Sequence, residues 1–226
     1  MNWQQAYTAY LFDLDGTLVD SAPDIHAALN HSLQYKGLAK VDLALTRDFV
    51  GQGSRALIQR ALDHHNISAK QASDTVIEEM LREFLAYYEA NIAVHSKPFP
   101  DVEKTLTTLR ARGAKLAVVT NKYDHLTRKV LTELGLKGYF DVLVSSETTP
   151  TPKPAAAPAL YACEKLNVAP DEVLFVGDAA PDVGCARAAG CAVVVYKDGY
   201  NNGVGADQLG ADGVYSSITE LLQASP

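Results

Sequence analysis

The sequence predicts an α/β protein in which a doubly wound, mostly parallel sheet carries a small all-helical domain inserted after its first strand. Two observations lead to this prediction. Short, continuously apolar segments alternate with helical patterns along most of the chain, as is typical of parallel strands covered by helices on both faces. From about residue 20 to residue 93, however, helical patterns follow one another without a strand. We therefore expect a core domain of residues 1–19 and 94–226 and a helical domain of residues 20–93.

The first part of the chain contains one expected strand and four expected helices. Ala9 to Phe12 forms a short apolar run, which predicts a buried strand. Asp20 or Ser21 is a suitable N-cap for the helix that follows, because short polar side chains accept hydrogen bonds from free backbone N–H groups. Apolar residues at spacings of three and four predict helices over residues 24–33, 42–49, 54–64 and 74–89. Pro98 and Pro100 then predict an extended loop.

The second part of the chain alternates between helices and strands. Helices are expected over residues 102–112, 126–134, 158–166 and 182–189. Glycines at 113, 135 and 190 follow three of them and are typical helix ends. Strands are expected over residues 115–120, 140–144, 172–177, 191–196 and 213–215. This alternation predicts that the strands join the Ala9 strand in one parallel sheet.

Composition narrows the classes of function. The 226 residues are 47% hydrophobic and carry a formal net charge of −7, which argues against broad electrostatic binding to nucleic acid or to an anionic membrane. No apolar run has the ~18–20 residues of a membrane span, and the first residues lack the pattern of a signal peptide. Three cysteines in no metal-binding spacing suggest reduced thiols. We therefore expect a cytoplasmic protein with a small-molecule partner.

Polar side chains gather where the expected strands end. In a doubly wound sheet, ligands bind beyond the carboxyl ends of the strands. The residues in those positions are Asp13 and Asp15, Thr120 with Asn121 and Lys122, Lys153, and Asp178 with Asp182. Each has an ordinary explanation when taken alone, as a helix cap or a solvated loop residue. Their coincidence at one edge favours a single site that binds a phosphate group and a hard cation such as Mg²⁺.

These residues resemble the haloacid dehalogenase superfamily of phosphohydrolases. Residues 13–17, Asp-Leu-Asp-Gly-Thr, match its first motif, Thr120 the second, Lys153 the third, and Asp178 with Asp182 the fourth. The helical domain is similar to the small cap of that family. Residues 118–122, 139–141, 153–154 and 199–201 resemble the phosphoglycolate phosphatase group in particular. Two departures are Ala179, where many members have serine, and the Pro- and Thr-rich segment 149–153.

The resemblance implies a mechanism and a role for each site residue. Asp13 would attack phosphorus to form an aspartyl-phosphate, and Asp15 would transfer protons to the leaving group and from the attacking water. Lys153, Thr120 and Asn121 would bind the phosphoryl oxygens. Mg²⁺ would be held by the carboxylates of Asp13 and Asp178 and by the backbone carbonyl of Asp15, while Asp182 would orient waters or neighbouring groups. The implied substrate is 2-phosphoglycolate, hydrolysed to glycolate and phosphate.

We expect the cap to determine which substrate is bound, and the sequence leaves the identity of that substrate open. We expect the loop of residues 50–55 to contact the substrate. Gly51 and Gly53 permit the backbone to approach a ligand closely, and Arg55 can form two parallel hydrogen bonds with a carboxylate. The competing interpretation is that the glycines shape a helix start and Arg55 is solvated. A sugar-phosphate phosphatase or a phosphosugar mutase on the same core remains an alternative. A non-catalytic relative and a dehalogenase are less consistent with the full set of carboxylates. The oligomeric state, monomer or homodimer, is also left open.

Overall fold

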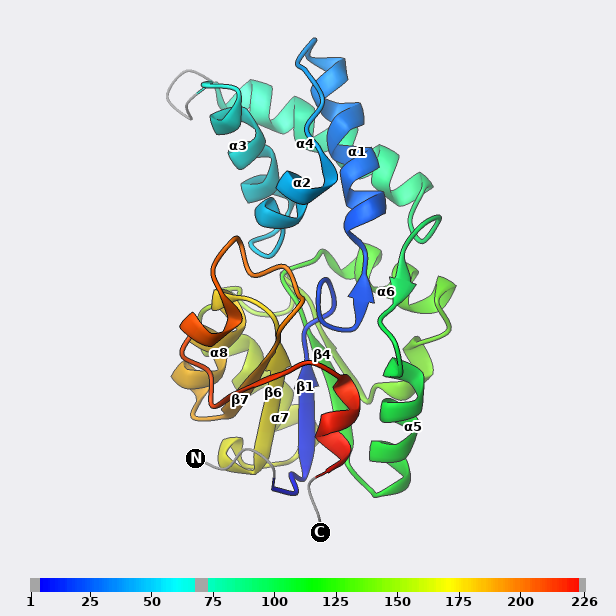
Figure 1. Ribbon diagram of the computed structural model, residues 1–226, viewed down its shortest axis with the longest axis vertical. Helices are drawn as coiled ribbons and strands as arrows, with labels where there is room; N and C mark the ends of the chain where they lie inside the picture. The colour runs from blue at the N-terminus through cyan, green and yellow to red at the C-terminus, as the bar shows by residue number, and fades with distance from the viewer. Residues whose placement is uncertain (1–4, 68–72, 224–226) are drawn as a thin grey trace.

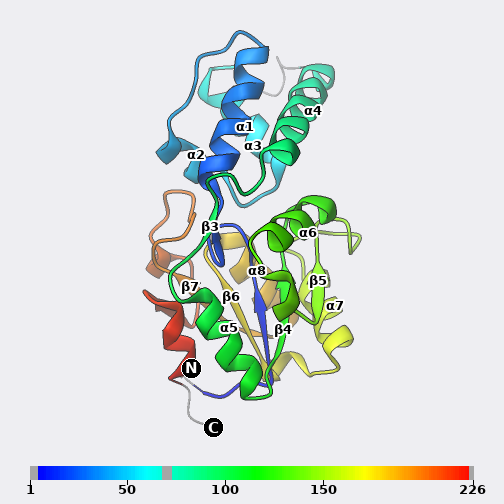
Figure 2. The same cartoon turned by 90° about the vertical axis from the view of Figure 1, so that its right-hand side faces the viewer.

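The computed structural model, which describes residues 5–67 and 73–223, contains a six-stranded sheet (Figures 1 and 2). From one edge to the other its strands are β5 (Val142–Val144), β4 (Lys115–Val119), β1 (Ala9–Phe12), β6 (Val173–Gly177), β7 (Ala192–Tyr196) and β8 (Gly213–Tyr215). Every neighbouring pair is parallel. The first strand lies in the middle and later strands are added on both sides, which confirms the doubly wound arrangement.

The strands are apolar throughout because both faces of the sheet are covered. In β1, Tyr10 and Phe12 belong to the hydrophobic cluster on one face, and Ala9 and Leu11 belong to the cluster on the other. Among the helices that alternate with the strands, α5 (Val102–Ala111) and α6 (Asp124–Glu133) contribute to the first cluster, and α7 (Ala157–Leu166) and α8 (Ala180–Ala189) contribute to the second. Alternate residues of a strand point to opposite faces, so a strand between two helical layers needs apolar residues at every position.

The helical segment of the chain stands beyond one end of the sheet (Figures 1 and 2). Its helices are α1 (Ala22–Tyr35), α2 (Leu43–Phe49), α3 (Ser54–His64) and α4 (Asp74–Ala90). The side chain of Ser73 caps α4 by accepting a hydrogen bond from the backbone N–H of Val76. Met80 and Phe84 of α4 are buried in the same cluster as Leu29 of α1. The predicted helices are therefore present, with boundaries that differ by up to two residues.

A two-stranded antiparallel ribbon joins the helical segment to the sheet, and the sequence did not predict it. Its strands are β2 (Val19–Asp20) and β3 (Lys97–Pro98). Pro98, expected in an extended loop, lies in β3, where the ribbon has only two strands and a missing N–H costs little. The carboxylate of Asp24 accepts hydrogen bonds from the backbone N–H groups of His95 and Ser96 beside the ribbon. The proposed boundaries, 1–19 and 94–226 against 20–93, fall at this ribbon and stay a prediction.

The start of α1 differs from the predicted capping. Ser21 is the N-cap residue, but its side chain makes no capping hydrogen bond and donates to the carboxylate of Asp15. Asp20 lies in β2, where its carboxylate pairs with Arg47. Pro23 in the first turn has no N–H to cap, which lessens the need for a side-chain acceptor there. Ser21 is thus free to bind Asp15 near the carboxyl end of β1, and Asp20 is free to pair with Arg47 of α2.

The boundaries of the remaining predicted elements agree with the sequence to within two residues, including α6, which begins at Asp124, and α8, which begins at Ala180. Over the described residues, none of the helices is both long enough and apolar enough to cross a lipid bilayer.

Candidate active site

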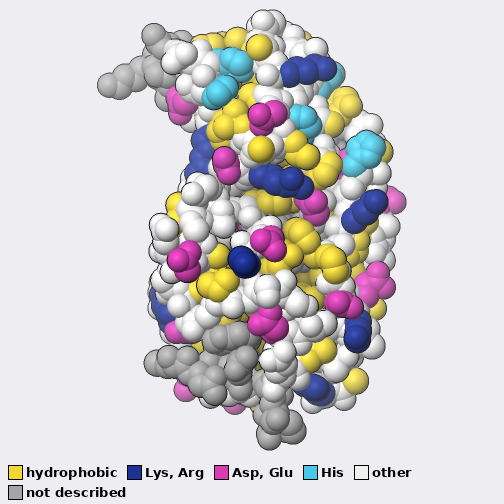
Figure 3. Space-filling view, viewed as in Figure 1, with side chains coloured by type: hydrophobic (Ala, Val, Ile, Leu, Met, Phe, Trp, Pro, Cys, Tyr) yellow, Lys and Arg dark blue, Asp and Glu magenta, His cyan; other side chains and the backbone are white. Residues whose placement is uncertain are grey.

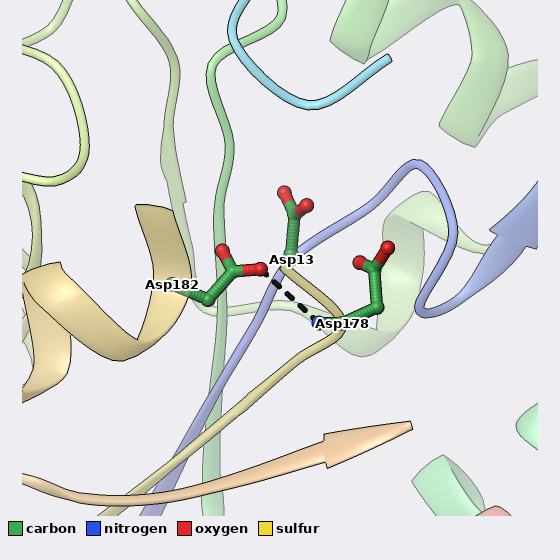
Figure 4. Close-up of side chains that lie close together, drawn as sticks. All are labelled: Asp13, Asp178 and Asp182. Atoms are coloured by element: carbon green, nitrogen blue, oxygen red, sulfur yellow. Dashed lines mark hydrogen bonds between the residues drawn. The ribbon is translucent and has the colours of Figure 1, made fainter. Parts of the chain in front are cut away.

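Three carboxylates meet at the carboxyl end of the central strands (Figure 4). Asp13 follows β1, Asp178 follows β6, and Asp182 lies in the first turn of α8. Each offers an oxygen atom, and these atoms all lie within 4.8 Å of one another. The pairing of β1 with β6 brings their ends level, since Phe12 lies opposite Val176. Residues 165 positions apart in the chain are therefore neighbours because of strand register.

Lys153 is the cation of this cluster. Its Nζ lies 2.8 Å from Oδ1 of Asp13 and 2.6 Å from Oδ1 of Asp182. It also donates to the backbone carbonyl of Val119 at 2.8 Å. The lysine side chain is only 1% exposed, so these contacts replace nearly all of its hydration. Lys153 therefore fixes Asp13 and Asp182 relative to β4.

Asp182 also holds the loop that contains Asp178. Its Oδ2 accepts hydrogen bonds from the backbone N–H groups of Asp178 at 3.1 Å and Ala179 at 3.0 Å. A Cβ atom on Gly177 would lie 2.4 Å from the side chain of Asp182, so glycine is required for this close approach. Ala179 has no side-chain hydroxyl, and its backbone N–H is satisfied by Asp182.

Asp178 is oriented by two further segments. Its Oδ1 accepts a hydrogen bond from Oγ1 of Thr17 at 2.6 Å, and its Oδ2 accepts one from the backbone N–H of Tyr200 at 2.6 Å. Gly16 has φ of 86°, and a Cβ atom there would lie 2.4 Å from the Asp178 carboxylate. The loops after β1 and β7 thus enclose Asp178, and its carboxylate is almost fully buried.

The cluster carries more negative than positive charge. With three carboxylates and the single ammonium of Lys153, its net charge is −2 when all four groups are ionised. Burial raises the pKa of Asp13 to about 6, although Lys153 opposes the shift and the nearby Asp182 adds to it. Burial raises the pKa of Asp178 well above its ordinary value, and the carboxylates of Asp182 and Asp13 add to the shift. A divalent cation would balance this charge, and carboxylate oxygens are the ligands that Mg²⁺ prefers.

A second ion pair lies beside the first. Nζ of Lys122 donates to both carboxylate oxygens of Asp15, at 3.0 and 2.8 Å, and to the hydroxyl of Tyr88 at 2.8 Å. Oγ of Ser21 donates to Oδ1 of Asp15 at 2.6 Å. Asp15 and Lys122 thereby come together from the ends of β1 and β4, and Tyr88 reaches them from α4. The pair raises the pKa of Lys122 against the effect of burial, which keeps the ammonium charged.

A cavity separates this edge of the sheet from the helical segment. Asp13, Asp15 and Thr120 line it from the sheet side. Ile25, Val50, Leu57 and Phe84 line it from the helical side, together with Tyr88. The cavity therefore has a polar floor and a mostly apolar roof.

Comparison with known proteins assigns the chain to a family. Residues 10–196 match the model of the haloacid dehalogenase-like hydrolases. The chain belongs to this family. It is 37% identical over 212 residues to the phosphoglycolate phosphatase of Colwellia psychrerythraea, with 94% of each chain covered, and 35% identical over the full length of that of Nitrosospira multiformis. The crystal structure of a predicted phosphoglycolate phosphatase from Haemophilus somnus superposes with a TM-score of 0.90 at 33% identity, covering 99% of each chain.

In this haloacid dehalogenase-like hydrolase, the helical segment is the cap and the six-stranded sheet lies in the core. The predicted site residues Asp13, Asp15, Lys153 and Asp178 lie together below the cap, as does Asp182. Strand ends predicted this part of the site because the parallel topology places them all at one edge.

Thr120 and Asn121 line the same cavity, but Asn121 has structural contacts as well. Its Nδ2 donates to the backbone carbonyls of Lys153 at 3.1 Å and Gly51 at 3.3 Å, and its Oδ1 accepts from the backbone N–H of Lys153. Asn121 thus holds the loop that contains Lys153 and contacts the loop of residues 50–55. Thr120 is buried, and its Oγ1 accepts a hydrogen bond from the backbone N–H of Lys122 at 3.3 Å. The hydroxyl proton of Thr120 remains available to a bound oxygen.

Arg55 is the predicted site residue that lies apart from the others. Its guanidinium pairs with Asp74, at 3.3 Å, and with Glu78, both on α4, and its side chain is 46% exposed. The neighbouring residue Ser54 lines the cavity, whereas Arg55 is absent from the described lining. Successive residues of a helix point about 100° apart, which explains the difference. The arrangement therefore gives no support to the predicted contact between Arg55 and a substrate carboxylate.

Lys122 and Tyr88 are cavity residues to which the sequence alone assigned no role. Lys122 directly follows Thr120 and Asn121, so its position was a usable signal, but a lysine after a strand is ordinarily solvated. Tyr88 fits the apolar face of α4, and the pattern gave no sign that its hydroxyl faces a lysine of the core. Their meeting depends on how the cap lies over the sheet.

Proposed function

We propose that this enzyme hydrolyses a small phosphate monoester through an aspartyl-phosphate on Asp13, with Mg²⁺ as cofactor and 2-phosphoglycolate as substrate. The observation that carries the proposal is the buried cluster of Asp13, Asp178 and Asp182 around the single ammonium of Lys153. The names of the relatives support the choice of substrate. In this proposal residues 20–93 are the cap and residues 1–19 and 94–226 the core.

The first step forms a bond between Asp13 and phosphorus. One carboxylate oxygen of Asp13 attacks, the bond from phosphorus to the ester oxygen breaks, and the electron pair leaves with that oxygen. Lys153 holds the attacking group in place and supplies positive charge beside it. Mg²⁺, held by the carboxylates of Asp13 and Asp178 and the backbone carbonyl of Asp15, would screen the charge of the incoming phosphate. The hydroxyl of Thr120 donates to a phosphoryl oxygen.

Asp15 moves the proton in both steps. In its protonated form it gives the proton to the leaving oxygen, and as a carboxylate it then takes one from the water that attacks the aspartyl-phosphate. Such general acid–base assistance contributes roughly 10²- to 10⁴-fold to the rate. The hydrogen bond from Ser21 and the contact with Lys122 keep the carboxyl group of Asp15 turned toward the cavity that it lines.

The cap excludes water and contacts the non-phosphate part of the substrate. Its apolar lining, including Leu57 and Phe84, suits a small substrate better than a heavily hydroxylated sugar, whose hydroxyl groups would lose hydrogen bonds to water there. Because the aspartyl-phosphate is also the intermediate of phosphosugar mutases, the destination of the phosphoryl group distinguishes the two reactions.

The proposed setting is the cytoplasm. All three cysteines are buried free thiols, which is consistent with a reducing compartment. On the face shown in Figure 3, side chains of both charges are scattered, and no basic patch gathers among the described residues there. With the net charge of −7, this supports a small-molecule partner rather than nucleic acid.

The test is phosphate release from a panel of esters that includes 2-phosphoglycolate and several sugar phosphates, with Mg²⁺ and with excess chelator. We expect Mg²⁺-dependent release with a strong preference for 2-phosphoglycolate, and no turnover by a folded Asp13→Asn variant. Release favouring sugar phosphates would refute the substrate assignment. Transfer of the phosphoryl group to a second sugar position would indicate a mutase. A folded Asp13→Asn variant with full activity would refute the nucleophile.

A further inference from the structure

Lys122 has a feature that the chemistry of proton transfer does not require. Its side chain is 5% exposed, and its ammonium reaches both Asp15 in the core and the hydroxyl of Tyr88 in the cap. The ammonium also lies 4.6 Å from the centre of the Tyr88 ring. The charge of Lys122 is balanced by Asp15, and Ser21 orients Asp15 through a separate hydrogen bond. Lys122 also lines the cavity.

The charge of the cavity lining makes Lys122 distinctive. Among the described residues that line the cavity, it is the one with a positively charged side chain. Lys153 approaches Asp13 from the side of β4 and α8, outside that lining. The cap contributes Gly53 and Ser54 at the start of α3, where the first backbone N–H groups of the helix carry partial positive charge. An anionic group in the cavity would therefore find its strongest partner at Lys122.

Geometry places this partner next to the leaving group. Asp15 donates its proton to the ester oxygen in the proposed mechanism, and Nζ of Lys122 is 2.8 Å from the carboxylate of Asp15. Lys122 therefore contacts Asp15, the same group that donates its proton to the ester oxygen. A carboxylate joined to that oxygen through a single carbon atom can reach the ammonium, whereas an uncharged alcohol has no charge to offer it.

We propose that Lys122, held by Tyr88, is the specificity-determining residue that selects phosphate esters with a carboxylate next to the ester carbon. This inference rests on the proposed function, because it concerns the substrate of the same site. It places the recognising cation on the core, directly after Thr120 and Asn121, instead of at Arg55 of the cap. Tyr88 reaches Lys122 from α4, so the recognition site is complete when the cap covers the core.

The test compares two substrates that differ in one group. The enzyme is assayed on 2-phosphoglycolate and on 2-hydroxyethyl phosphate, in which a hydroxymethyl group replaces the carboxylate, and selectivity is the ratio of the two kcat/KM values. Any loss of proton transfer through Asp15 lowers both values, so the ratio isolates recognition. We expect Lys122→Met to lower this ratio about 10- to 100-fold, the range for a lost charge-assisted hydrogen bond. Lys104→Met, on the exposed side of α5, is the matched control and should leave the ratio unchanged.

Tyr88→Phe provides a second, milder test should Lys122→Met fail to fold. It removes only the hydroxyl that accepts from Lys122, and we expect KM for 2-phosphoglycolate to rise several-fold while KM for 2-hydroxyethyl phosphate stays the same. A folded Lys122→Met variant that keeps the wild-type ratio would overturn the role of Lys122 and leave the proposed function intact. A wild-type enzyme that shows no preference between the two esters would overturn the carboxylate assignment itself. Absence of phosphate release from either ester would refute the proposed function.

Discussion

Replacing Asp13 with asparagine should make the metal-free protein more stable while abolishing its activity. The carboxylate is buried beside Asp178 and Asp182, and its pKa is raised from 3.8 to about 6. A group that binds its proton more tightly in the folded state than in the unfolded state destabilises the fold when it must ionise. Asparagine has nearly the same shape and no charge, and Lys153 keeps its ion pair with Asp182.

The pKa shift sets the size and the pH range of the effect. The difference between 3.8 and about 6 corresponds to about 3 kcal/mol at 1.36 kcal/mol per pKa unit. Well below pH 3.8, Asp13 is protonated in both states and the penalty vanishes. As the pH rises from about 4 to 6, the unfolded state loses its proton first, so wild-type stability falls relative to the variant. We therefore expect Asp13→Asn to gain about 3 kcal/mol above pH 7 and close to none below pH 4.

Urea unfolding in excess chelator, at pH 4 and at pH 7.5, measures this difference. Asp63→Asn, at an exposed position of α3, is the matched control and should not change the free energy of unfolding at either pH. In Mg²⁺ the stability advantage of Asp13→Asn over wild type should shrink or reverse, because the cation stabilises the wild-type carboxylate and the variant offers the cation a weaker ligand. A variant that is less stable than wild type in chelator at pH 7.5, or a gain independent of pH, would refute the argument from buried charge.

Two further substitutions probe the packing around the carboxylates of Asp178 and Asp182. Gly177→Ala should destabilise the fold by about 1–3 kcal/mol and lower kcat/KM, because the new Cβ would lie 2.4 Å from Asp182. Thermal unfolding and activity assays measure these effects. Gly138→Ala is the control, because a Cβ at Gly138 would enter open space. Thr17→Val removes the hydroxyl that donates to Asp178 and should weaken Mg²⁺ binding about 10- to 100-fold, as measured by Mg²⁺ titration of activity. Unchanged Mg²⁺ dependence in Thr17→Val would show that this hydrogen bond does not orient the ligand.

The family, the sheet and the core of the site could be predicted because each depends on a short segment and one topological rule. Apolar strands such as Ala9 to Phe12 are visible locally, and parallel strands place their carboxyl ends at one edge. Asp13, Lys153 and Asp178 therefore needed no knowledge of side-chain geometry to be placed together. The family match over residues 10–196 confirms the family, and the parallel order of the strands confirms the sheet, whereas the roles of the site residues stay a prediction.

Contacts between the cap and the core could not be predicted from local sequence patterns. Ser21 was a suitable helix cap by sequence, but the fold brings Asp15 within hydrogen-bonding distance of its hydroxyl. Arg55 was a plausible anion ligand, but the rotation of α3 directs it to Glu78 of α4 and leaves Ser54 at the cavity. A rotation of one residue along a helix exchanges an inward for an outward position, and periodicity does not specify that rotation to a single residue.

Lys122 and Tyr88 illustrate the same limit over a longer range. Thirty-four residues separate them, one on a core strand end and one on a cap helix, and each has an ordinary local interpretation. Their hydrogen bond exists because the ribbon of β2 and β3 sets the cap over the edge of the sheet. Local patterns specify the elements and the order of the strands, which is enough to place Asp13, Lys153 and Asp178 together. The side of the cavity formed by the cap is specified by packing between the cap and the sheet, which depends on the shapes of both surfaces at once.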